Sequence, residues 1–598
     1  MSDKAFLIVD VGSTTTKAIL IEPGMDGYRV TERGEAPTTV EKPDENVMVG
    51  VRNAISQISR PLETMQFLAT SSAGGGLQVI VCGLSRFVTA ESAEKAALGA
   101  GALLMDVFSA DDGRSLFEQM EALRKAKPDM VLLAGGIDRA VNVDFIIEFC
   151  DLLNSTRPVP RFGQGHALPV VYAGCPNGRP LVQDTLAQGF DLHIVPNLRP
   201  ELDEENLEPA REAIHDVFLT HVMAQAPGYP VLKESVCQPV MPTPLAVGRI
   251  MTRLAERDDI EIVGADIGGA TTDVFSVLEH EFNRTVSANL GMSYSAGNVL
   301  QLAGIENIMR WLPFAVDAAW LQDRVMDKLI FPTTVPATLL DLLLEQALAR
   351  EALRMSLEHH VSLVTSLNKQ PSSVQRALLT QDAQLTVTRK RQQLLDMQRI
   401  GLVVGSGGVL SHAPRRPQAA AMLLDAFAPR GYTFLAVDSI FMMPHLGALS
   451  EIEPEIALEV LERDCFIPLG PCVSLLAATG GELGKVAGEL TLRTPQKVSQ
   501  RRIHVGEVLC LPLGRKQQGL LRIEAAAGCD FGSGAGRDCE RTVSGGEVGI
   551  IVDVRGQSLA NLPLAKQQTL TKKMLLSLGA FTREELERCA EEVSRYAR

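Results

Sequence analysis

Two stretches of the chain share a pattern in which an apolar run ends in an aspartate, a glycine and small hydroxyl residues. The runs 6–11 and 262–267 are followed by GSTTTK and GGATTD, respectively. Each run has the length and composition of a buried strand. Each carries a carboxylate, Asp10 or Asp266, near its end, and the bare backbone N–H and hydroxyl groups that follow can surround a phosphate. The pattern therefore predicts two strand-to-loop phosphate sites.

Each loop is followed by two apolar segments that predict a β-hairpin. In the first copy, residues 18–21 and 28–30 flank a Gly-Met-Asp-Gly turn. In the second copy, residues 274–277 and 282–286 flank a His-Glu connection. Short apolar segments on either side of a tight turn are typical of hairpins. The repeat therefore extends beyond the loops.

Paired glycines end one further apolar segment in each half, at 131–137 and at 402–409. We interpret these two segments as equivalent strands, so that the whole order of strand, loop, hairpin and Gly-Gly strand end is duplicated. This layout resembles the actin, hexokinase and 70-kDa chaperone superfamily over roughly residues 1–450. The resemblance implies an α/β protein with a duplicated actin-like (ribonuclease-H-like) two-lobed ATPase fold, a helical insertion and a small β-rich domain at the C-terminal end.

The segments between the repeats indicate how the rest of the chain is organised. Residues 110–200 alternate helix and strand, which predicts parallel strands joined by helices. Short strands divided by Gly-rich turns after about residue 455 predict a small barrel or sandwich, and a capping box at 582–585 begins a helix near the end. The predicted domains are a first actin-like lobe (1–245), a second lobe (246–455) with a helical insertion at about 296–400, a small β-rich domain (456–565) and a helical tail (566–598).

Composition excludes several classes of protein. The 598 residues carry a formal net charge of −15, which argues against general nucleic-acid binding because phosphate backbones are held by clustered Lys and Arg. We find no apolar run near the ~20 residues that cross a bilayer and no signal peptide, so we expect a cytoplasmic protein without a membrane partner. The ten cysteines lack Cys-x-x-Cys spacing, which excludes zinc-ribbon, thioredoxin-like and ferredoxin-like sites.

Two phosphate loops on facing lobes are suited to bind ATP with Mg²⁺. Because Mg²⁺ prefers oxygen ligands and keeps several waters, Asp10 and Asp266 are the predicted metal ligands and catalytic residues. Lys17 either offsets phosphate charge or points to solvent. The glycines at 405–408 either let the nucleoside lie against the backbone or permit close helix-to-strand packing. No Walker A sequence occurs, which excludes a P-loop NTPase. The predicted nucleotide-binding residues are Gly12, Ser13, Thr14, Thr15, Lys17, Gly268, Gly269, Thr271, Thr272, Gly405, Gly407 and Gly408.

Five segments together are similar to the glutamate-mutase-associated MutL (GlmL) family, which is unrelated to the mismatch-repair protein of similar name. They are residues 10–17, 133–138, 265–273, 349–352 and 405–410. The resemblance implies an ATP-dependent reactivating chaperone that exchanges damaged cobalamin in an adenosylcobalamin-dependent mutase of the glutamate mutase or aminomutase type. It also implies ATP and Mg²⁺ as cofactors and the mutase subunits as partners, and it leaves the oligomeric state unspecified.

Three alternatives remain open at this point. A small-molecule kinase would use the same fold to phosphorylate a substrate hydroxyl in the cleft. An ATP-dependent activator of a radical enzyme, of the 2-hydroxyacyl-CoA dehydratase type, shares a similar loop, although such activators hold an iron–sulfur cluster with paired cysteines and this sequence has no matching Cys motif. A protein with decayed nucleotide sites is a further alternative, against which the intact Asp10 and Asp266 argue.

Overall fold

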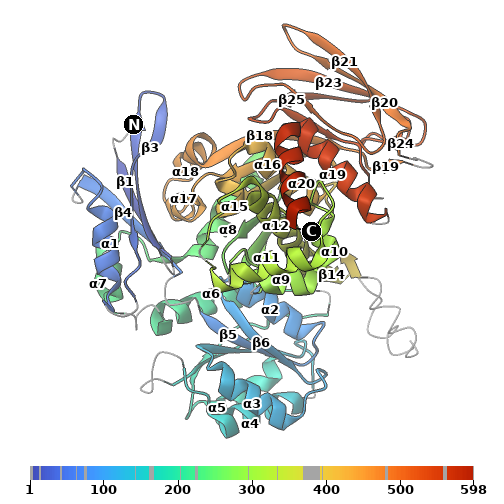
Figure 1. The fold of residues 1–598 in the computed structure, drawn as a ribbon. Coiled ribbons are helices and arrows are strands. Elements are labelled where there is room, and N and C mark those ends of the chain that lie inside the picture. The colour runs from blue at the N-terminus through green and yellow to red at the C-terminus, as the bar shows by residue number, and fades with distance from the viewer. Residues whose placement is uncertain are drawn as a thin grey trace.

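The computed structural model shows two lobes side by side, a smaller α/β unit beside them and a β-rich sheet at the opposite end (Figure 1). The structure describes residues 4–12, 15–40, 44–61, 64–72, 77–141, 143–160, 167–202, 204–222, 227–287, 289–293, 295–332, 334–367, 391–393, 395–478, 483–556 and 562–596.

The first lobe is built on a five-stranded sheet with β1 at its centre. Leu7 and Val9 of β1 join the hydrophobic cluster on one face of the sheet, and Phe6 and Ile8 join the cluster on the other face. Because alternate side chains of a strand point to opposite faces, a strand covered on both sides is apolar throughout. In spatial order the strands are β10 (Met241–Pro242), β4 (Met65–Ser71), β1 (Ala5–Val11), β2 (Thr15–Gly24) and β3 (Gly27–Pro37), with helices α1 (Val47–Ile55) and α7 (Tyr229–Ser235).

The second lobe repeats this sheet and extends it. β11 pairs antiparallel with β12 and parallel with β16, as β1 pairs with β2 and β4. The structure therefore confirms the predicted duplicated two-lobed fold. In spatial order the strands are β13 (Glu281–Ser287), β12 (Thr272–Leu278), β11 (Glu261–Ile267), β16 (Ile400–Ser406), β17 (Gly431–Asp438), β18 (Phe466–Ser474), β26 (Ile550–Asp553) and β22 (Val508–Leu511).

Two helices join the lobes at their base. Helix α8 (Thr243–Asp258) follows β10, and helix α17 (Met443–Ser450) follows β17, so the pair is also related by the repeat. A Cβ atom on Gly447 would lie 1.9 Å from the carbonyl oxygen of Ala246. Only glycine therefore allows the two helices to cross so closely, and the two lobes are connected at this crossing.

The Gly-Gly strand of the first half is not the counterpart of β16. That strand is β7, which lies in a separate parallel sheet inserted between β4 and β10, whereas β4 occupies the position equivalent to β16. The sheet has the order β6-β5-β7-β8-β9, a doubly wound arrangement. The predicted alternation of helix and strand over 110–200 is confirmed. The elements of the insertion are β5 (Gln78–Gly83), α2 (Thr89–Gly99), β6 (Leu103–Ser109), α3 (Leu116–Ala126), β7 (Met130–Leu133), α4 (Asp144–Thr156), β8 (Pro169–Tyr172), η2 (Pro176–Gly178), α5 (Arg179–Leu186), β9 (Asp191–Ile194), α6 (Glu208–Val217) and η3 (Phe218–Val222).

A second insertion, largely helical, lies between β13 and β16. Helix α12 begins at a capping box in which Thr338 and Asp341 exchange hydrogen bonds, and its leucines are buried against the second lobe. The helical insertion expected at about 296–400 thus contains one long helix, α12. The elements are α9 (Ala296–Ala303), α10 (Ile305–Met309), α11 (Ala318–Ile330), α12 (Leu339–Leu363), β14 (Thr365–Leu367) and β15 (Arg391–Gln393), and after β16 follow α15 (Gly408–Ser411) and α16 (Arg416–Phe427).

The C-terminal part is β-rich, as expected, but it is continuous with the second lobe. Strands β18, β26 and β22 extend the second-lobe sheet, and a four-stranded sheet packs against them around a shared apolar cluster. Helices α19 and α20 return to the second lobe, and the predicted capping box of Thr582 and Glu585 is present. The elements are α18 (Pro454–Val460), η5 (Leu461–Cys465), β19 (Ala477–Ala478), β20 (Val486–Arg493), β21 (Val498–His504), β23 (Gln518–Ala525), β24 (Cys529–Asp530), β25 (Cys539–Ser544), α19 (Leu564–Leu578) and α20 (Arg583–Tyr596).

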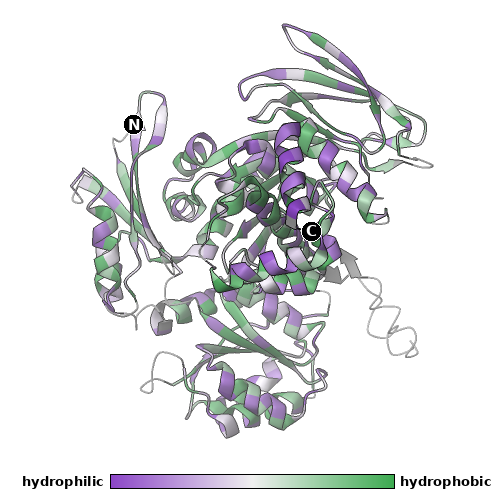
Figure 2. Cartoon of the chain, in the orientation of Figure 1, coloured by the Kyte–Doolittle hydropathy of each residue, from purple (hydrophilic) through white to green (hydrophobic). Residues whose placement is uncertain are grey.

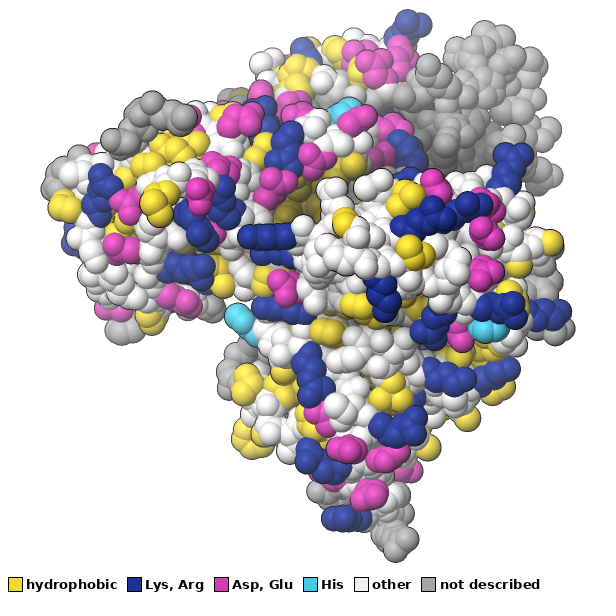
Figure 3. All heavy atoms as spheres, turned by 90° about the horizontal axis from the view of Figure 1, so that it is seen from above, with side chains coloured by type: hydrophobic (Ala, Val, Ile, Leu, Met, Phe, Trp, Pro, Cys, Tyr) yellow, Lys and Arg dark blue, Asp and Glu magenta, His cyan; other side chains and the backbone are white. Residues whose placement is uncertain are grey.

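Hydrophobic residues concentrate on the strands of the inserted sheet and on the central elements (Figure 2). Acidic and basic side chains are interspersed on the face seen from above, without one continuous basic stripe there (Figure 3). Among the helices that the structure describes, none combines the length and apolar character needed to cross a membrane.

Candidate nucleotide site

The two predicted phosphate loops adopt the same turn. The N–H of Gly12 donates to the carbonyl of Thr15 at 3.0 Å, and the N–H of Gly268 donates to the carbonyl of Thr271 at 2.8 Å. A Cβ atom on Gly12 would lie only 2.6 Å from the Thr15 carbonyl oxygen, so this turn requires glycine. The predicted loop residues Ser13 and Thr14 lie outside the described residues. The repeat seen in the sequence is therefore also a repeat of backbone hydrogen bonding.

Asp10 is held at the centre of the first lobe by hydroxyl groups. The residue is 4% exposed, and one of its carboxylate oxygens, Oδ1, accepts hydrogen bonds from the hydroxyls of Thr70 and Thr243, both at 2.7 Å. Thr70 lies directly beside Asp10 on the neighbouring strand, and Thr243 begins helix α8. These two contacts fix the orientation of the carboxylate from two different elements.

Asp266 has the equivalent position in the second lobe but different surroundings. Burial, and after it the nearby carboxylates of Asp273 and Asp438, raise its pKa to about 7, although Lys17 acts in the opposite direction. Asp273 lies directly opposite Asp266 across the hairpin, so both side chains project from the same face of the sheet. A cation beside Asp266 would relieve this repulsion.

Asp438, at the end of β17, belongs to the same carboxylate cluster. Its Oδ1 accepts the backbone N–H of Ile440 and of Phe441, at 3.2 and 2.9 Å. Its Oδ2 is buried and has no hydrogen-bond partner in the described part of the chain, and the same is true of Oδ1 of Asp273. Buried carboxylate oxygens without a donor are costly unless a cation or water satisfies them. The second lobe therefore offers oxygen ligands of the kind that Mg²⁺ prefers.

Asp438 was not among the predicted site residues. The signal that points to it is an aspartate at the end of an apolar strand, the same signal that identified Asp10 and Asp266, but Ser439 and two apolar residues follow it in place of the glycine and the group of small hydroxyl residues that follow those two.

Lys17 links the two lobes. Its Nζ lies 3.5 Å from the carbonyl oxygen of Ile440 in the second lobe, and its charge acts on Asp266. The backbone carbonyl of Lys17 lies 3.3 Å from Nε2 of the buried His445 on α17. Lys17 is therefore directed into the interlobe region rather than to solvent, and its role in offsetting phosphate charge stays a prediction.

The three predicted glycines of the β16 loop differ in what surrounds them. The space beside Gly405 is filled by Leu410 and Leu423, so packing accounts for its missing side chain. Gly407 has φ +97° and approaches the backbone of Ile267, where a Cβ would lie 2.2 Å from the carbonyl oxygen. A Cβ atom on Gly408 would meet nothing within 4 Å. Of the three, Gly408 leaves open space for a ligand.

The predicted threonines also differ in burial and in their hydrogen bonds. The hydroxyl of Thr272 is buried and donates to the carbonyl of Leu290, so it is engaged in the protein interior. Thr15 and Thr271 are half-buried at the loops, where their backbone carbonyls close the glycine turns.

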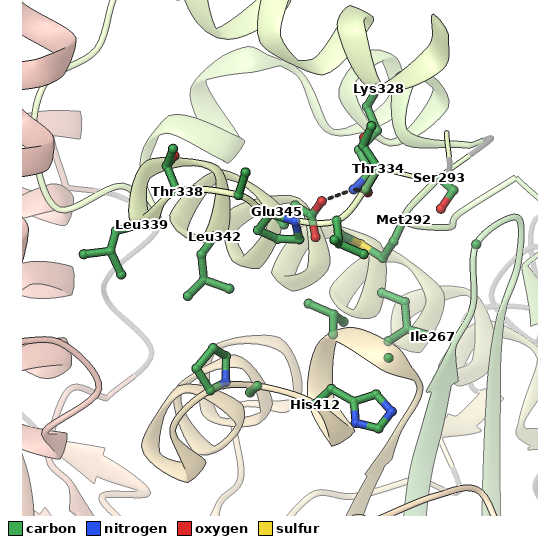
Figure 4. A pocket seen from close by; sticks show the side chains of 18 of the residues that line it. Ile267, Met292, Ser293, Lys328, Thr334, Thr338, Leu339, Leu342, Glu345 and His412 are labelled. Atoms are coloured by element: carbon green, nitrogen blue, oxygen red, sulfur yellow. Dashed lines mark hydrogen bonds and ion pairs between the residues drawn. The ribbon is translucent and has the colours of Figure 1, made fainter. Parts of the chain in front are cut away.

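Two cavities meet at the β16 loop and share Gly408 and His412. The smaller, of about 400 Å³, lies between the lobes and includes Lys17, Ile440 and His445. The larger, of about 980 Å³, lies within the second lobe and is shown in Figure 4. Gly408 therefore stands where a ligand in one cavity could extend toward the other.

The larger cavity brings together elements far apart in the sequence. The second phosphate loop contributes Gly268 and Gly269, and Figure 4 shows Met292 and Ser293 on the same side. Lys328 of α11, which also lines the cavity, pairs with Glu345 of α12. Helix α20 closes part of the lining with Arg588, Cys589 and Glu592. Sequence patterns did not indicate that the helical tail would reach this cavity, because no local pattern encodes that contact.

Comparison with known proteins identifies relatives over most of the chain. A family model described as MutL protein matches residues 6–465. Protein MutL of Clostridium tetanomorphum is 30% identical over 501 residues, which cover 77% of this chain and 98% of that protein.

Solved structures are more distant. Nucleotide-free acetone carboxylase aligns with 11% identity and a TM-score of 0.32, over 84% of this chain and 81% of that chain. Component A of (R)-2-hydroxyglutaryl-CoA dehydratase from Acidaminococcus fermentans aligns with 10% identity and a TM-score of 0.25, over 76% of this chain and 99% of that chain. Scores of this size support no conclusion about the site.

Proposed function

Because the chain belongs to the MutL protein family, we propose that it is a Mg²⁺-dependent ATPase that reactivates an adenosylcobalamin-dependent mutase of the glutamate mutase or aminomutase type by exchanging damaged cobalamin. The observation that carries the proposal is the pair of equivalent glycine turns, each beside an aspartate, on two lobes connected by crossed helices.

The residues present fit ATP and Mg²⁺. The N–H groups of the two loops and the Lys17 ammonium group provide donors for phosphate oxygens, and Gly408 leaves room for the nucleoside. Asp266, with Asp273 and Asp438 nearby, provides the negative charge that a hydrated Mg²⁺ requires, and Asp10 holds the equivalent position in the first lobe. When bound, Mg²⁺ would neutralise charge on the phosphates.

A hinged nucleotide clamp suits the proposed role. An adenosylcobalamin enzyme loses the adenosyl group of its cofactor through radical side reactions, and the damaged cofactor then stays in a closed site. A protein that alternates between two lobe arrangements can transmit that change to a partner. The inserted sheet is well placed for this, because its helix α2 packs on β13 of the second lobe and so spans both lobes.

The first test concerns the nucleotide. Asp10→Asn and Asp266→Asn should each abolish ATP hydrolysis while circular dichroism shows the parental fold. Gly408→Val should weaken nucleotide binding, measured by calorimetry, because the branched side chain would occupy space that the protein itself leaves open. Leu513→Val, in the apolar cluster of the β-rich part, is the matched control and should bind nucleotide normally. Parental hydrolysis in both aspartate variants would rule out this site.

The second test concerns the partner. The cognate mutase, inactivated with hydroxocobalamin or cyanocobalamin, should regain activity when this protein, ATP, Mg²⁺ and fresh adenosylcobalamin are added. Release of the damaged cofactor is followed by its visible absorbance after filtration. A nonhydrolysable ATP analogue or the Asp266→Asn variant should fail to restore activity. Equal recovery with and without the protein would contradict the chaperone role, and an ATP-dependent phosphorylated metabolite would instead support a kinase.

A further inference from the structure

A group of three polar side chains on the inserted sheet is independent of the nucleotide site. Asp191 and His193 lie two residues apart on β9, the edge strand, so their side chains project from the same face. His221 reaches them from η3, a π-helical turn that follows α6. Single π-helical turns occur frequently at functional sites, since they re-aim one side chain out of the regular helical pattern.

The ligand atoms of this group converge on one point. Nε2 of His193 lies 3.1 Å from Oδ2 of Asp191, and Nε2 of His221 lies 2.8 Å from the same oxygen. The two imidazole rings are perpendicular, with centroids 6.4 Å apart, so they aim their nitrogens at a common centre rather than stacking. Among the residues that the structure describes, this is the only group of three or more His, Cys, Asp or Glu side chains whose ligand atoms all lie within 4.8 Å of one another.

We propose that Asp191, His193 and His221 form a binding site for a divalent transition-metal ion, with zinc as the best chemical fit. Imidazole nitrogens suit zinc, copper, iron and nickel, whereas Mg²⁺ and Ca²⁺ prefer sites made entirely of oxygen. Zinc takes His and Asp ligands at about 2.0–2.2 Å in tetrahedral geometry, which places ligand atoms about 3.3 Å apart. The separations of the two histidine nitrogens from Oδ2 of Asp191 need to open by only a few tenths of an ångström, and the ligand atoms of all three residues lie within 4.8 Å of one another.

The site has room for a fourth ligand. The side chains of Asp191, His193 and His221 retain 40%, 36% and 23% of their exposure, so water can reach the bound ion. Three protein ligands and an accessible fourth position make an open site. A metal here would join the edge strand β9 to the π-helical turn η3. Without a metal, the contact between Asp191 and His221 connects these two elements at this point.

Metal titration of the full-length protein tests the proposal. After treatment with a chelator, calorimetry with Zn²⁺ should detect one site per chain that is lost in His193→Ala and in His221→Ala. Removing a ligand should weaken binding by more than the ~10-fold to 100-fold that loss of an outer-shell partner typically costs. His504→Ala is the matched control, because His504 contacts a single carboxylate, that of Glu507, and should bind zinc as the parent does.

Cobalt substitution identifies the ligands. Co²⁺ bound here should give the visible absorption of a four- or five-coordinate ion without a thiolate charge-transfer band, and Cys237→Ser, which removes the exposed cysteine, should leave the spectrum unchanged. Zinc should also raise the melting temperature of the parent but not of the nearly isosteric Asp191→Asn variant, which keeps the proposal testable if an alanine variant fails to fold. Absence of zinc binding, or unchanged affinity in both histidine variants, would overturn the proposal and leave Asp191 as a hydrogen-bond acceptor only.

Discussion

The two phosphate loops share an equivalent backbone hydrogen bond but differ in the charges beside it. Across the first hairpin, Asp10 lies directly opposite Lys17, whereas across the second hairpin Asp266 lies directly opposite Asp273. Side chains at such positions are neighbours on one face of the sheet. The first hairpin therefore pairs its aspartate in register with a basic residue, whereas the second pairs its aspartate with another acidic residue.

The surroundings of the two aspartates enlarge this difference. Asp10 accepts hydrogen bonds from Thr70 and Thr243, both of which stabilise the carboxylate. Asp266 has Asp438 as a further acidic neighbour, and burial together with these charges raises its pKa to about 7. The glycine turn is the same in the two copies, whereas the charged residues beside the aspartate differ. The second loop therefore needs a cation that the first does not.

The largest effect should appear in metal-dependent nucleotide affinity. Asp266→Asn should reduce the contribution of Mg²⁺ to ATP binding by about 100-fold, since a divalent ion beside a half-buried carboxylate gains a few kcal/mol. Asp10→Asn should reduce it by only about 10-fold, because Asp10 has no acidic residue directly opposite it across the hairpin and its carboxylate already accepts hydrogen bonds from Thr70 and Thr243. Calorimetry of ATP binding with and without Mg²⁺ measures both. A larger loss in Asp10→Asn would reverse the assignment of the metal to the second lobe.

A smaller effect should appear in the pH dependence. Because the pKa of Asp266 is about 7 in the folded protein, its carboxylate takes up a proton as the pH falls through 7. This proton then competes with Mg²⁺ for the carboxylate. Asp273→Asn removes a like charge and should lower that pKa, which moves the acidic limit of Mg²⁺-ATP binding down by about one pH unit. Asp538→Asn, which removes a half-exposed carboxylate in the β-rich part, should leave the limit in place. An unchanged profile in Asp273→Asn would mean that burial alone sets the pKa.

The loops were predictable because their determinants are local. The turns at Gly12 and Gly268 need only a strand end, a glycine and the carbonyl group three residues later. Both hairpins likewise follow from short-range patterns. The capping box of α20 was local in the same sense. Fold class could be inferred from the repetition of these units.

Determinants distant in the sequence could not be predicted. Apolar runs ending in paired glycines look alike in β7 and β16, yet β7 belongs to the inserted sheet, since strand pairing rather than composition decides the sheet. Leu423, which fills the space beside Gly405, and Arg588 in the large cavity both come from helices whose docking depends on tertiary packing. The sequence therefore predicted candidate residues in the loops, and it did not predict the residues that line the cavities from other elements.

The two aspartates should also differ in their effect on stability. A folded-state pKa above the unfolded value means that the folded protein binds this proton more tightly, so stability falls as pH rises from about 4 to about 7 and stays reduced above that. Asp266→Asn should therefore stabilise the metal-free protein at pH 8 by about 1–2 kcal/mol. Asp10→Asn should be neutral or slightly destabilising, because the amide oxygen can still accept from both threonines. Urea unfolding in the presence of EDTA measures both, and destabilisation by Asp266→Asn would contradict the expected repulsion.

The smallest effect compares the two hydroxyl residues that lie beside the aspartates on the neighbouring strands. Thr70 and Ser406 occupy equivalent positions and both are fully buried. The Thr70 hydroxyl donates to Asp10, whereas that of Ser406 lies near enough to Asp266 to lower its pKa but forms no hydrogen bond with any described residue.

Replacing each hydroxyl measures this difference. Thr70→Val should cost about 1 kcal/mol, since Thr243 still serves the Asp10 carboxylate. Ser406→Ala should cost less than about 0.5 kcal/mol or even stabilise, because it removes an unsatisfied polar group. Urea unfolding at neutral pH compares the two variants. Equal costs would show that Ser406 also donates to its aspartate, and the contrast between the loops would then rest on the acidic neighbours of Asp266 alone.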